Sequence, residues 1–586
     1  MDDNKWDLTR MFKDETEFRD TILEVKNMLD EIVKYKGKIL DSSENLNNVL
    51  DLDSKIDLLA ERLYVYTHLG HYGDMSDKVF QEYKEEVIAL YDLSSSVRTF
   101  ITPELLSSNY EDVISLLGDD SKYKYSLEKT FRYKEHILSE KEEQILSDCS
   151  EIMRVPKTTF DALNNIDIIF GKAKDSNGEY FELTNSNYSV LLSSKDKTLR
   201  KNAFKKMYKY YKDHINTISS LYIGKVKSNS FISKTRKYKN ILDMYLFDDK
   251  IDSKVYKNLI KITNKNTSFL KKYYKLKENK LGYKLHMYDT YVNTSNSLEK
   301  NISYEDAIKI VNDALKPLGS DYLEKFNYLL NNSVVDVYPA DKKRSGAYQW
   351  GSYGILPYVS LNYENNMDSV STFAHEMGHA MHTYYSDNNQ DFLYASYPIF
   401  LAEIASTVNE VLLSNYLINN SKDKDEIIYY IVEFLDKFKA TVYRQVMFAE
   451  FENVIHEKYE NNISLTKDLL CETYLKLNKK HFSPSVVVDK DIQYEWARIP
   501  HFYSSFYVYK YATGFISALI IADKLINNEE GFKEKYISFL SSGCSDYPLE
   551  LLNKLGIDIT DEKVLEKAFL LFKEKVDLLE KYESGE

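Results

Sequence analysis

Residues 368–386 constrain the chain more than any other stretch, because they carry His-Glu-Met-Gly-His at positions 375–379 within an apolar, helix-like pattern. Two histidines four residues apart lie on one face of a helix, about one turn apart, so both imidazoles can reach a single zinc ion. The carboxylate of Glu376 would lie beside them, where it can take a proton from a zinc-bound water. The pattern therefore predicts a helix that offers His375 and His379 as metal ligands and Glu376 as a general base.

Three neighbouring residues complete the prediction for this helix. Asp368 is a suitable N-cap at its start. Gly378 costs about 1 kcal/mol in a helix interior, so we expect close packing to offset that cost. His382 shares a face with His375 but lies about 10 Å further along the axis, at about 1.5 Å per residue, which is too far for both to bind one ion. We therefore expect His382 to pack or to support a ligand, and a second helix must supply the third ligand.

That second helix is predicted for residues 400–413, just after Pro398, which suits a helix start. Most of the stretch is apolar or small, so a glutamate within it needs a partner, and a metal ion would provide one. Glu403 is therefore the predicted third zinc ligand. Glu410 lies two turns further on the same face, and two interpretations stay open: an acceptor that orients a ligand imidazole, or a solvated helix carboxylate.

Taken alone, the five-residue motif also occurs by chance in unrelated proteins, but the two stretches together resemble a known metal site. Residues 375–382 and 400–406 are similar to the site of the thimet oligopeptidase family of zinc metallopeptidases, and most similar to its bacterial branch, oligoendopeptidase F. The resemblance extends upstream to residues 344–348 and downstream to His501, and it covers nearly the whole chain. It implies a mainly α, two-lobed helical peptidase around a deep substrate channel, with a small β element beside the zinc helix. Such a channel would admit short unstructured peptides and exclude folded proteins.

Composition narrows the classes of protein that this chain can be. At 586 residues it is several times the usual domain size, and its net charge of -14 argues against a nucleic-acid partner. No run approaches the roughly 18 apolar residues of a membrane span, and the first ten residues carry no apolar signal core. Three widely spaced cysteines, Cys149, Cys471 and Cys544, fit a reducing compartment. We expect a cytoplasmic protein with no membrane partner, and its oligomeric state stays open.

Three regions are predicted along the chain. Residues 1–110 show apolar residues at helical spacing and form an N-terminal helical region. Residues 111–195 are predicted to be helical with a small hairpin around Asn177-Gly178, as part of the N-terminal lobe. Residues 196–586 form the predicted catalytic zinc metallopeptidase region. Proline and glycine are scarce, at 9 and 18 residues, as expected for a mostly helical protein.

Residues 333–363 differ from the rest, because branched and aromatic residues give them a β-like pattern. Pro357 cannot donate to a central ladder, so its run, residues 353–363, is predicted to be an edge strand. An edge strand just before the zinc helix could hold an extended peptide by main-chain hydrogen bonds. Residues 344–354 have two open interpretations, a flexible turn or lid beside that strand and an ordinary glycine-rich connection.

A second group of candidate residues lies nearer the C-terminus, where Tyr503, Tyr507 and Tyr511 recur every four residues and could share a helix face. An aromatic stripe with this spacing is most often part of a core. The family resemblance implies that a histidine and tyrosines of this part hydrogen-bond the substrate carbonyl and the developing oxyanion. The nearest matches are His501, Tyr507 and Tyr511. Their register is open, so Tyr503 or Tyr509 could replace one of them.

These residues favour a zinc-dependent endopeptidase that cleaves internal bonds of short unstructured peptides with a water activated by Glu376. His375, His379 and Glu403 would hold one Zn²⁺ and leave a position open for that water.

Two alternatives stay open. A zinc exopeptidase of the dipeptidyl carboxypeptidase type would also have to recognise a chain end, for which Arg498 and Lys510 are available cations. A non-catalytic peptide-binding protein is the other alternative, although a binding protein has no use for a general base at Glu376.

Overall fold

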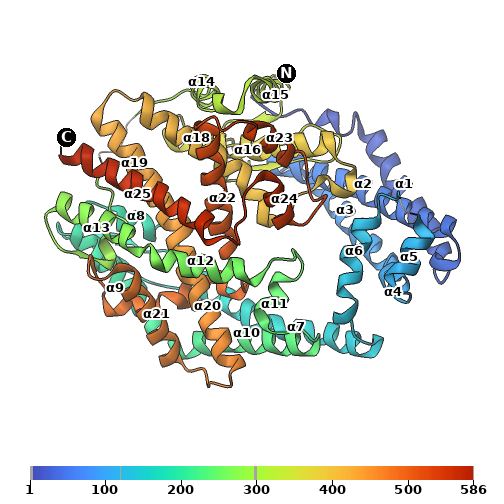
Figure 1. Ribbon diagram of the computed structural model, residues 1–586, viewed down its shortest axis with the longest axis horizontal. Helices are drawn as coiled ribbons and strands as arrows, with labels where there is room; N and C mark the ends of the chain where they lie inside the picture. Colours follow the sequence, from blue (N-terminus) through green and yellow to red (C-terminus); the bar gives the residue numbers. More distant parts are fainter. Residues whose placement is uncertain (1–3, 119, 296–299, 585–586) are drawn as a thin grey trace. The chain divides into compact units, whose positions relative to one another are not determined.

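The computed structural model describes residues 4–118, 120–295 and 300–584, and α-helices dominate it (Figure 1). The predicted mainly α class is confirmed. Within these residues, no helix combines the length and the apolarity that a membrane span needs. The chain divides into two compact units: unit 1 holds Met1–Glu135, Glu299–Leu413 and Ile521–Gly556, and unit 2 holds His136–Leu298, Ser414–Ile520 and Ile557–Glu586.

Unit 1 consists of helices and one small sheet. Its N-terminal helices α1, α2 and α3 pack on one another around Phe18, Leu63 and Val87, which are fully buried. The helices of unit 1 are α1 (Glu15–Ile32), α2 (Ser43–Gly73), α3 (Lys78–Val97), α4 (Ile101–Leu106), α5 (Tyr110–Leu117), α6 (Lys124–Arg132), α14 (Tyr304–Ala314), α15 (Ser320–Leu330), α16 (Met367–Asn389), α17 (Phe392–Ala395), α23 (Phe532–Leu540) and α24 (Pro548–Leu555).

Unit 2 is also helical, with two pairs of short strands. Helix α19 packs on α25, and α13 packs on α21 and α25. Two further helices, α18 (Ile399–Asn420) and α22 (Tyr509–Ile526), each begin in one unit and end in the other. The helices of unit 2 are α7 (Glu140–Asn165), α8 (Tyr188–Ser193), α9 (Lys197–Asp213), α10 (Ile215–Thr235), α11 (Ile241–Leu246), α12 (Ser253–Lys265), α13 (Thr267–Leu281), α19 (Lys424–Phe438), α20 (Arg444–Glu460), α21 (Lys467–Phe482) and α25 (Glu562–Ser584).

Local side chains explain where many helices begin and end. Asp14, Ser42 and Thr466 accept hydrogen bonds from backbone N–H groups at the starts of α1, α2 and α21. These acceptors satisfy N–H groups that have no partner within the helix. Gly282 and Gly556 end α13 and α24 in the left-handed region, where a glycine carries no steric penalty.

A three-stranded sheet lies against α16, as predicted for the β element beside the zinc helix. Its strands are β4 (Val335–Asp336), β6 (Tyr358–Ser360) and β5 (Tyr348–Trp350), in that order, with β6 parallel to β4 and antiparallel to β5. The predicted edge position of the run that contains Pro357 is therefore wrong, since β6 is the central strand. Pro357 directly precedes β6, so its missing N–H interrupts no ladder bond. An edge strand is instead β5, which arises within the predicted turn at residues 344–354.

The predicted hairpin in unit 2 is confirmed. Strand β1 (Lys172–Lys174) pairs antiparallel with β2 (Tyr180–Glu182), and Gly178 in the turn has a φ of +95°. A second pair joins β3 (Leu285–His286) to β7 (Val486–Val487) in parallel. The two units are each assembled from separated stretches of chain, whereas the regions predicted from sequence, 1–110, 111–195 and 196–586, are continuous and stay a prediction.

Candidate metal centre and aromatic cluster

The N-cap of helix α16 lies two residues before the predicted one, Asp368. The side-chain Oδ1 of Asn366 accepts a hydrogen bond from the backbone N–H of Ser369 at 2.9 Å, so Asn366 is the N-cap. The prediction of Asp368 as the cap is wrong, because Asp368 already lies in the first turn. Its negative charge there still interacts favourably with the helix dipole.

Gly378 brings α16 into close contact with α18, the predicted second helix. A Cβ atom at Gly378 would lie 2.6 Å from Cα of Ser406 and 2.8 Å from the carbonyl oxygen of Ala405. Only a residue without a side chain allows this approach, which explains the glycine in a helix interior. Asn409 adds a cross-link, since its Nδ2 donates to the carbonyl of Ala374 at 3.1 Å. The backbones of the two helices are therefore fixed against each other where the predicted ligands lie.

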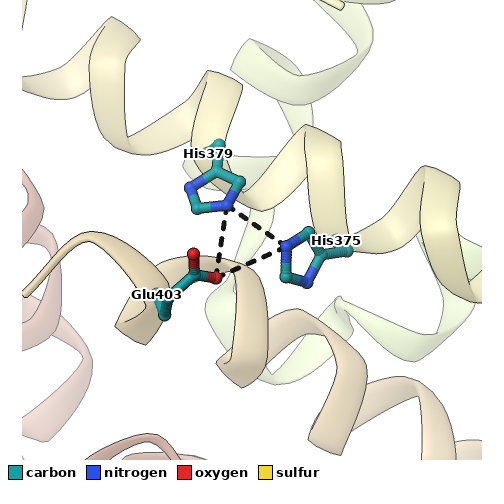
Figure 2. Close-up of side chains that lie close together, drawn as sticks. All are labelled: His375, His379 and Glu403. Carbon is teal, nitrogen blue, oxygen red and sulfur yellow. Dashed lines mark hydrogen bonds and ion pairs between the residues drawn. The ribbon is translucent and has the colours of Figure 1, made fainter. Parts of the chain in front are cut away.

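The three predicted metal ligands point toward one another (Figure 2). Nε2 of His375 lies 3.2 Å from Nε2 of His379, and each of these atoms lies 3.5 Å from Oε2 of Glu403. In a tetrahedral zinc site with bonds of about 2.0–2.1 Å, neighbouring donor atoms stand roughly 3.3 Å apart. The spacing of the three donors therefore fits one zinc ion.

Two further side chains orient these donors. Oε1 of Glu410 lies 3.0 Å from Nδ1 of His375, and the Glu410 side chain is only 11% exposed. Of the two interpretations left open for Glu410, the structure therefore supports the acceptor that orients an imidazole, with Nε2 of His375 directed at the other donors. The hydroxyl of Ser406 donates to Oε2 of Glu403 at 3.1 Å.

The charges in this cluster suit a metal site. The hydrogen bond from His379 lowers the pKa of Glu403 to about 2, although burial acts in the opposite direction. Burial lowers the pKa of His375, but the hydrogen bond to Glu410 outweighs it and the net pKa is raised. Glu403 is therefore a carboxylate at neutral pH, the form that binds a metal ion.

Glu376 lies on α16 between the two histidines and is 7% exposed. Burial raises its pKa, while the two neighbouring imidazoles act in the opposite direction. A carboxylate with a raised pKa is a stronger base when it is ionised, and bases in enzymes work best when their pKa is near the operating pH.

His382 packs, as expected, and lies apart from the donor cluster. It is 1% exposed, and its ring stacks on Tyr397 with centroids 3.8 Å apart. Burial lowers the pKa of His382 to about 3, so the ring is neutral.

The predicted aromatic residues of unit 2 form a cluster of their own. The hydroxyl of Tyr511 lies 3.4 Å from Nε2 of His501. The ring of Tyr507 lies 6.4 Å from that of His501 and 5.4 Å from that of Tyr511. All three side chains are partly exposed, and burial lowers the pKa of His501. The lowered pKa favours a neutral His501 ring, and the ring and the two phenols carry N–H and O–H donors, one of which the contact between Tyr511 and His501 uses.

The two alternative tyrosines belong to the core instead. Tyr503 stacks on Phe160 at 4.4 Å, and Tyr509 packs against Tyr256 at 5.2 Å. The expected single face of tyrosines does not form, because Tyr503 ends the 3₁₀ helix η9 (Pro500–Tyr503) and α22 begins only at Tyr509. Between them, Phe506 adopts a φ of +55°, a conformation that a bulky side chain rarely accepts.

A buried polar network that holds this turn was missed by the sequence analysis. Nδ2 of Asn229 donates to Oγ of Ser505 at 2.8 Å and lies 3.0 Å from Nε2 of His456. Glu452 accepts a hydrogen bond from the backbone N–H of Phe506, and burial raises the pKa of Glu452 to about 8. Glu452 and His456 are four residues apart on α20, which was the available signal, but an isolated glutamate–histidine pair is common on solvated helices.

The two cations considered for chain-end recognition have partners in unit 2. Nζ of Lys510 lies 2.8 Å from Oδ2 of Asp249. Nη1 of Arg498 lies 3.8 Å from Oε1 of Glu495, and its guanidinium stacks over Tyr188 at 4.9 Å. Both cations therefore already have a carboxylate partner within unit 2.

Comparisons with known proteins agree over nearly the whole chain. Residues 190–571 match the family described as Peptidase family M3, and residues 104–170 match the one described as Oligopeptidase F. Oligopeptidase PepF of Bacillus subtilis is 36% identical over 582 residues, which cover 99% of this chain and 87% of that protein. The Oligoendopeptidase F homolog of Borreliella burgdorferi is 37% identical over 588 residues, with 99% and 98% coverage.

Solved structures give the same result for the fold. A structure from Chlamydophila abortus superimposes with a TM-score of 0.93 at 35% identity and covers 99% of this chain and 98% of that one. Oligoendopeptidase-F from Enterococcus faecium superimposes with a TM-score of 0.75 at 31% identity, with 98% and 100% coverage.

Proposed function

Because the chain belongs to peptidase family M3, we propose that it is a zinc-dependent endopeptidase that hydrolyses internal bonds of short, unstructured oligopeptides. The single observation that carries the proposal is the triangle of donor atoms from His375, His379 and Glu403, with spacings of 3.2, 3.5 and 3.5 Å. Such a triangle with an open fourth position is the arrangement of catalytic zinc sites.

His375, His379 and Glu403 would hold the ion, with Glu410 and Ser406 keeping two of these side chains in place. Bound there, zinc supplies a Lewis acid that polarises the scissile carbonyl and makes water more acidic.

Glu376 is the proposed general base. It would take a proton from the attacking water and later deliver it to the amine of the leaving product. Its burial supports this role, since a carboxylate shielded from bulk water holds a proton more readily between the two steps.

His501, Tyr507 and Tyr511 are the proposed donors to the negatively charged oxygen that develops on the cleaved carbonyl. Their mutual contacts support the assignment, and the burial of Tyr503 and Tyr509 weighs against the two alternatives.

Strand β5 is the proposed support for an extended substrate. It pairs with β6 on one side only within the described sheet, and it lies against the helix of the metal donors, where Oγ1 of Thr383 donates to Oε1 of Gln349 at 3.3 Å. Main-chain hydrogen bonds to such an edge bind peptides with little regard to sequence.

An exopeptidase of the dipeptidyl carboxypeptidase type is the alternative. It needs a cation for the terminal carboxylate, and the ion pairs of Lys510 and Arg498 weigh against both candidates.

The three cysteines are free, which supports the proposed cytoplasmic location.

The proposal is tested with an unstructured peptide of about ten residues, long enough to span an extended site at roughly 3.3–3.6 Å per residue. Both ends are blocked, products are identified by mass spectrometry, and a parallel sample contains a chelator. We expect internal cleavage that the chelator abolishes and added zinc restores.

Cleavage that persists in the chelator would overturn the metal-dependent mechanism. If the blocked peptide survives but an unblocked one loses residues from its C-terminal end, the enzyme is an exopeptidase. If neither is cut while both bind, the chain is a binding protein.

A further inference from the structure

Unit 2 contains a solvent-open cavity of about 320 Å³ whose lining residues all come from that unit, with Glu433 and Ala440 exposed. Ligand sites run from about 300 to 1,000 Å³, so this cavity suits a small molecule. Apolar and aromatic side chains form most of its walls. They include Phe204, Tyr208, Leu270, Tyr274, Met287 and Phe482.

An irregular turn of helix forms one side of this cavity. Between α19 and α20 the chain makes a π-helical turn, η7 (Lys439–Tyr443), and Lys439, Ala440 and Tyr443 of this turn line the cavity. Single π-helical turns within α-helices are rare and occur frequently at functional sites.

Buried ion pairs lie directly beside the turn. Nζ of Lys439 lies 2.7 Å from Oδ1 of Asp436, and Nζ of Lys277 lies 3.1 Å from Oδ2 of the same carboxylate. Nη2 of Arg444 lies 2.7 Å from Oε1 of Glu495, yet its side chain remains 25% exposed. Burying such pairs costs more than packing apolar residues of similar size, so their concentration around one void indicates a use for their charges.

The cations outnumber their carboxylates in these pairs. Asp436 is shared by two lysines, and Glu495 is shared by Arg444 and Arg498. Glu433 also lines the cavity and acts on Lys277, so three carboxylates face these four cations and one positive charge remains. A ligand carboxylate beside Arg444 and Lys439 would supply the missing negative charge, in the geometry that a guanidinium favours.

Two buried polar atoms in the lining lack a hydrogen-bond partner, and one of them, Oδ1 of Asn478, can only accept. Oδ1 of Asn478 and Nε2 of His481 have no hydrogen-bond partner among the described residues, and the two residues are 0% and 1% exposed. The amide orientation of Asn478 is defined, because its Nδ2 donates to the carbonyl of Tyr474 at 3.0 Å. A buried acceptor left unpaired costs about 1–3 kcal/mol. An N–H donor on a ligand would remove this cost.

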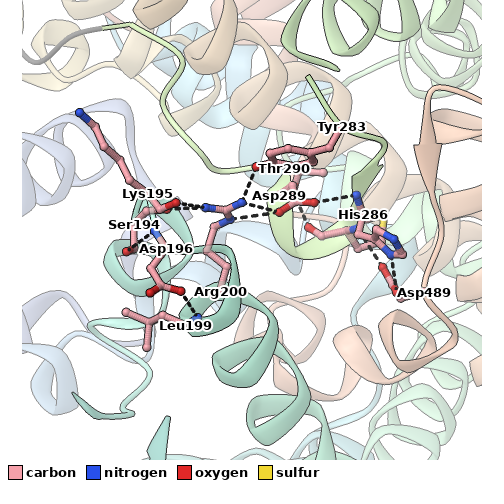
Figure 3. Close-up of polar contacts among 11 residues, drawn as sticks. Ser194, Lys195, Asp196, Leu199, Arg200, Tyr283, His286, Asp289, Thr290 and Asp489 are labelled. Atoms are coloured by element: carbon pink, nitrogen blue, oxygen red, sulfur yellow. Dashed lines mark hydrogen bonds and ion pairs between the residues drawn. The ribbon is translucent and has the colours of Figure 1, made fainter. Parts of the chain in front are cut away.

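A separate network fixes another part of the lining (Figure 3). This part adjoins Lys439, whose Nζ donates to the carbonyl of Thr290 at 3.3 Å. Arg200 and Asp289 form an ion pair at 2.8 Å with both side chains fully inaccessible to solvent. Asp289 also accepts a hydrogen bond from the backbone N–H of His286 at 3.0 Å. The segment fixed in this way contributes Met287 and Thr290 to the lining, so the site is built before any ligand enters.

We propose that this cavity is a second ligand site, lined by none of the metal donors, and that it binds a free amino acid or dipeptide with an apolar or aromatic side chain. The carboxylate lies against Arg444 and Lys439, the amino group donates to Asn478, and the side chain packs on the aromatic wall. The proposal stands independently of the proposed peptidase activity.

Isothermal titration of the full chain with L-phenylalanine tests the site, in the presence of a chelator so that the ligand cannot bind a metal ion. Phenethylamine, which lacks the carboxylate, and 3-phenylpropionate, which lacks the amino group, are the matched probes. We expect saturable binding of L-phenylalanine at one site per chain and at least tenfold weaker binding of both analogues.

Ala440→Phe fills the cavity from the π-helical turn and is expected to weaken binding of L-phenylalanine at least tenfold. Thr441→Val on the same turn does not line the cavity and is the control. No saturable binding to the wild type, or equal binding of either analogue, would overturn the proposal without any variant. Unchanged binding by a folded Ala440→Phe protein would place the ligand elsewhere and overturn it as well.

Discussion

The metal-donor cluster of α16 and α18 and the buried network of α20 both bring glutamate and histidine together, yet Glu403 and Glu452 reach opposite charge states. At α16 the imidazoles face the carboxylate of Glu403, whose pKa falls to about 2 because His379 hydrogen-bonds it. At α20 both side chains are buried, and this burial raises the pKa of Glu452 to about 8 and lowers that of His456 to about 4. The first region offers charged ligands to an ion, and the second is a neutral hydrogen-bonded network.

The difference shows that partners decide the chemistry of these residue types. Glu403, which an imidazole hydrogen-bonds, remains ionised and can bind a metal, whereas burial makes Glu452 keep its proton. At α20 the buried Glu452 has a structural use, because it accepts the N–H of Phe506 and so holds the left-handed residue that separates Tyr503 from α22.

The strongest test of the comparison applies one substitution to both helices. Glu376→Gln is expected to lower kcat by about 10²–10⁴ while the zinc content stays at one ion per chain, because only the base is lost. Glu452→Gln keeps an acceptor for the N–H of Phe506 and is expected to change kcat less than threefold. Peptide hydrolysis rates and elemental analysis measure both. Near-normal turnover by zinc-replete Glu376→Gln would refute the assignment of the base.

Two tyrosines two residues apart sharpen the comparison within unit 2. Tyr511→Phe is expected to lower kcat by about 10²–10³ with little change in KM, since an oxyanion donor acts mainly in the transition state. Tyr509→Phe is the matched control, because Tyr509 is fully buried against Tyr256. Steady-state kinetics on one fluorogenic peptide compares the pair. Equal losses in both variants would mean that the hydroxyls act through folding.

Substituting Glu410, which contacts Nδ1 of His375, tests the metal-donor cluster alone. Glu410→Ala is expected to weaken zinc binding by about 10–100-fold, since outer partners of ligand histidines typically contribute that much. Competition with a chromogenic chelator measures the affinity. Ser406→Ala, which loses only one hydrogen bond to Glu403, is expected to have a smaller effect. An unchanged affinity in Glu410→Ala would show that the contact does not support the site.

The smallest expected effect concerns stability and pH at α20. The pKa of Glu452 is raised in the folded protein, so the folded state keeps a proton that the unfolded state loses above about pH 4.5. Stability is therefore expected to fall as pH rises from about 4.5 to 8. Glu452→Gln removes this loss and should stabilise the protein at pH 8 by at least about 1 kcal/mol, with no gain at pH 4. Urea unfolding at both pH values measures it, and an equal gain at both would contradict the assignment.

The sequence predicted what depends on neighbours along the chain. The spacing of His375 and His379 defines a face of one helix, and the apolar surroundings of Glu403 predict its need for a partner. The mainly α class, the hairpin at Gly178 and the close approach at Gly378 follow from similarly local arguments. Each rests on periodicity or on a property of a single residue, so no knowledge of distant contacts was needed.

What the sequence did not predict depends on contacts between distant segments. Pro357 was taken to mark an edge, but its position just before β6 makes it harmless there. The charge state of Glu452 depends mainly on its burial by distant segments, which no local pattern encodes. The π-helical turn at Lys439–Tyr443 lies within one continuous amphipathic pattern, and only its three-dimensional neighbours make it differ from an α-helix.

The contact at Gly378 has a consequence for how this protein can change over time. Because the backbones of α16 and α18 touch there, the spacing of the three donors is set by main chain against main chain. Substitutions among the other residues of these helices can alter packing and substrate preference without moving the donors apart. The donor spacing is thereby preserved when surrounding residues are substituted, whereas a single methyl group at position 378 would push the two helix backbones apart.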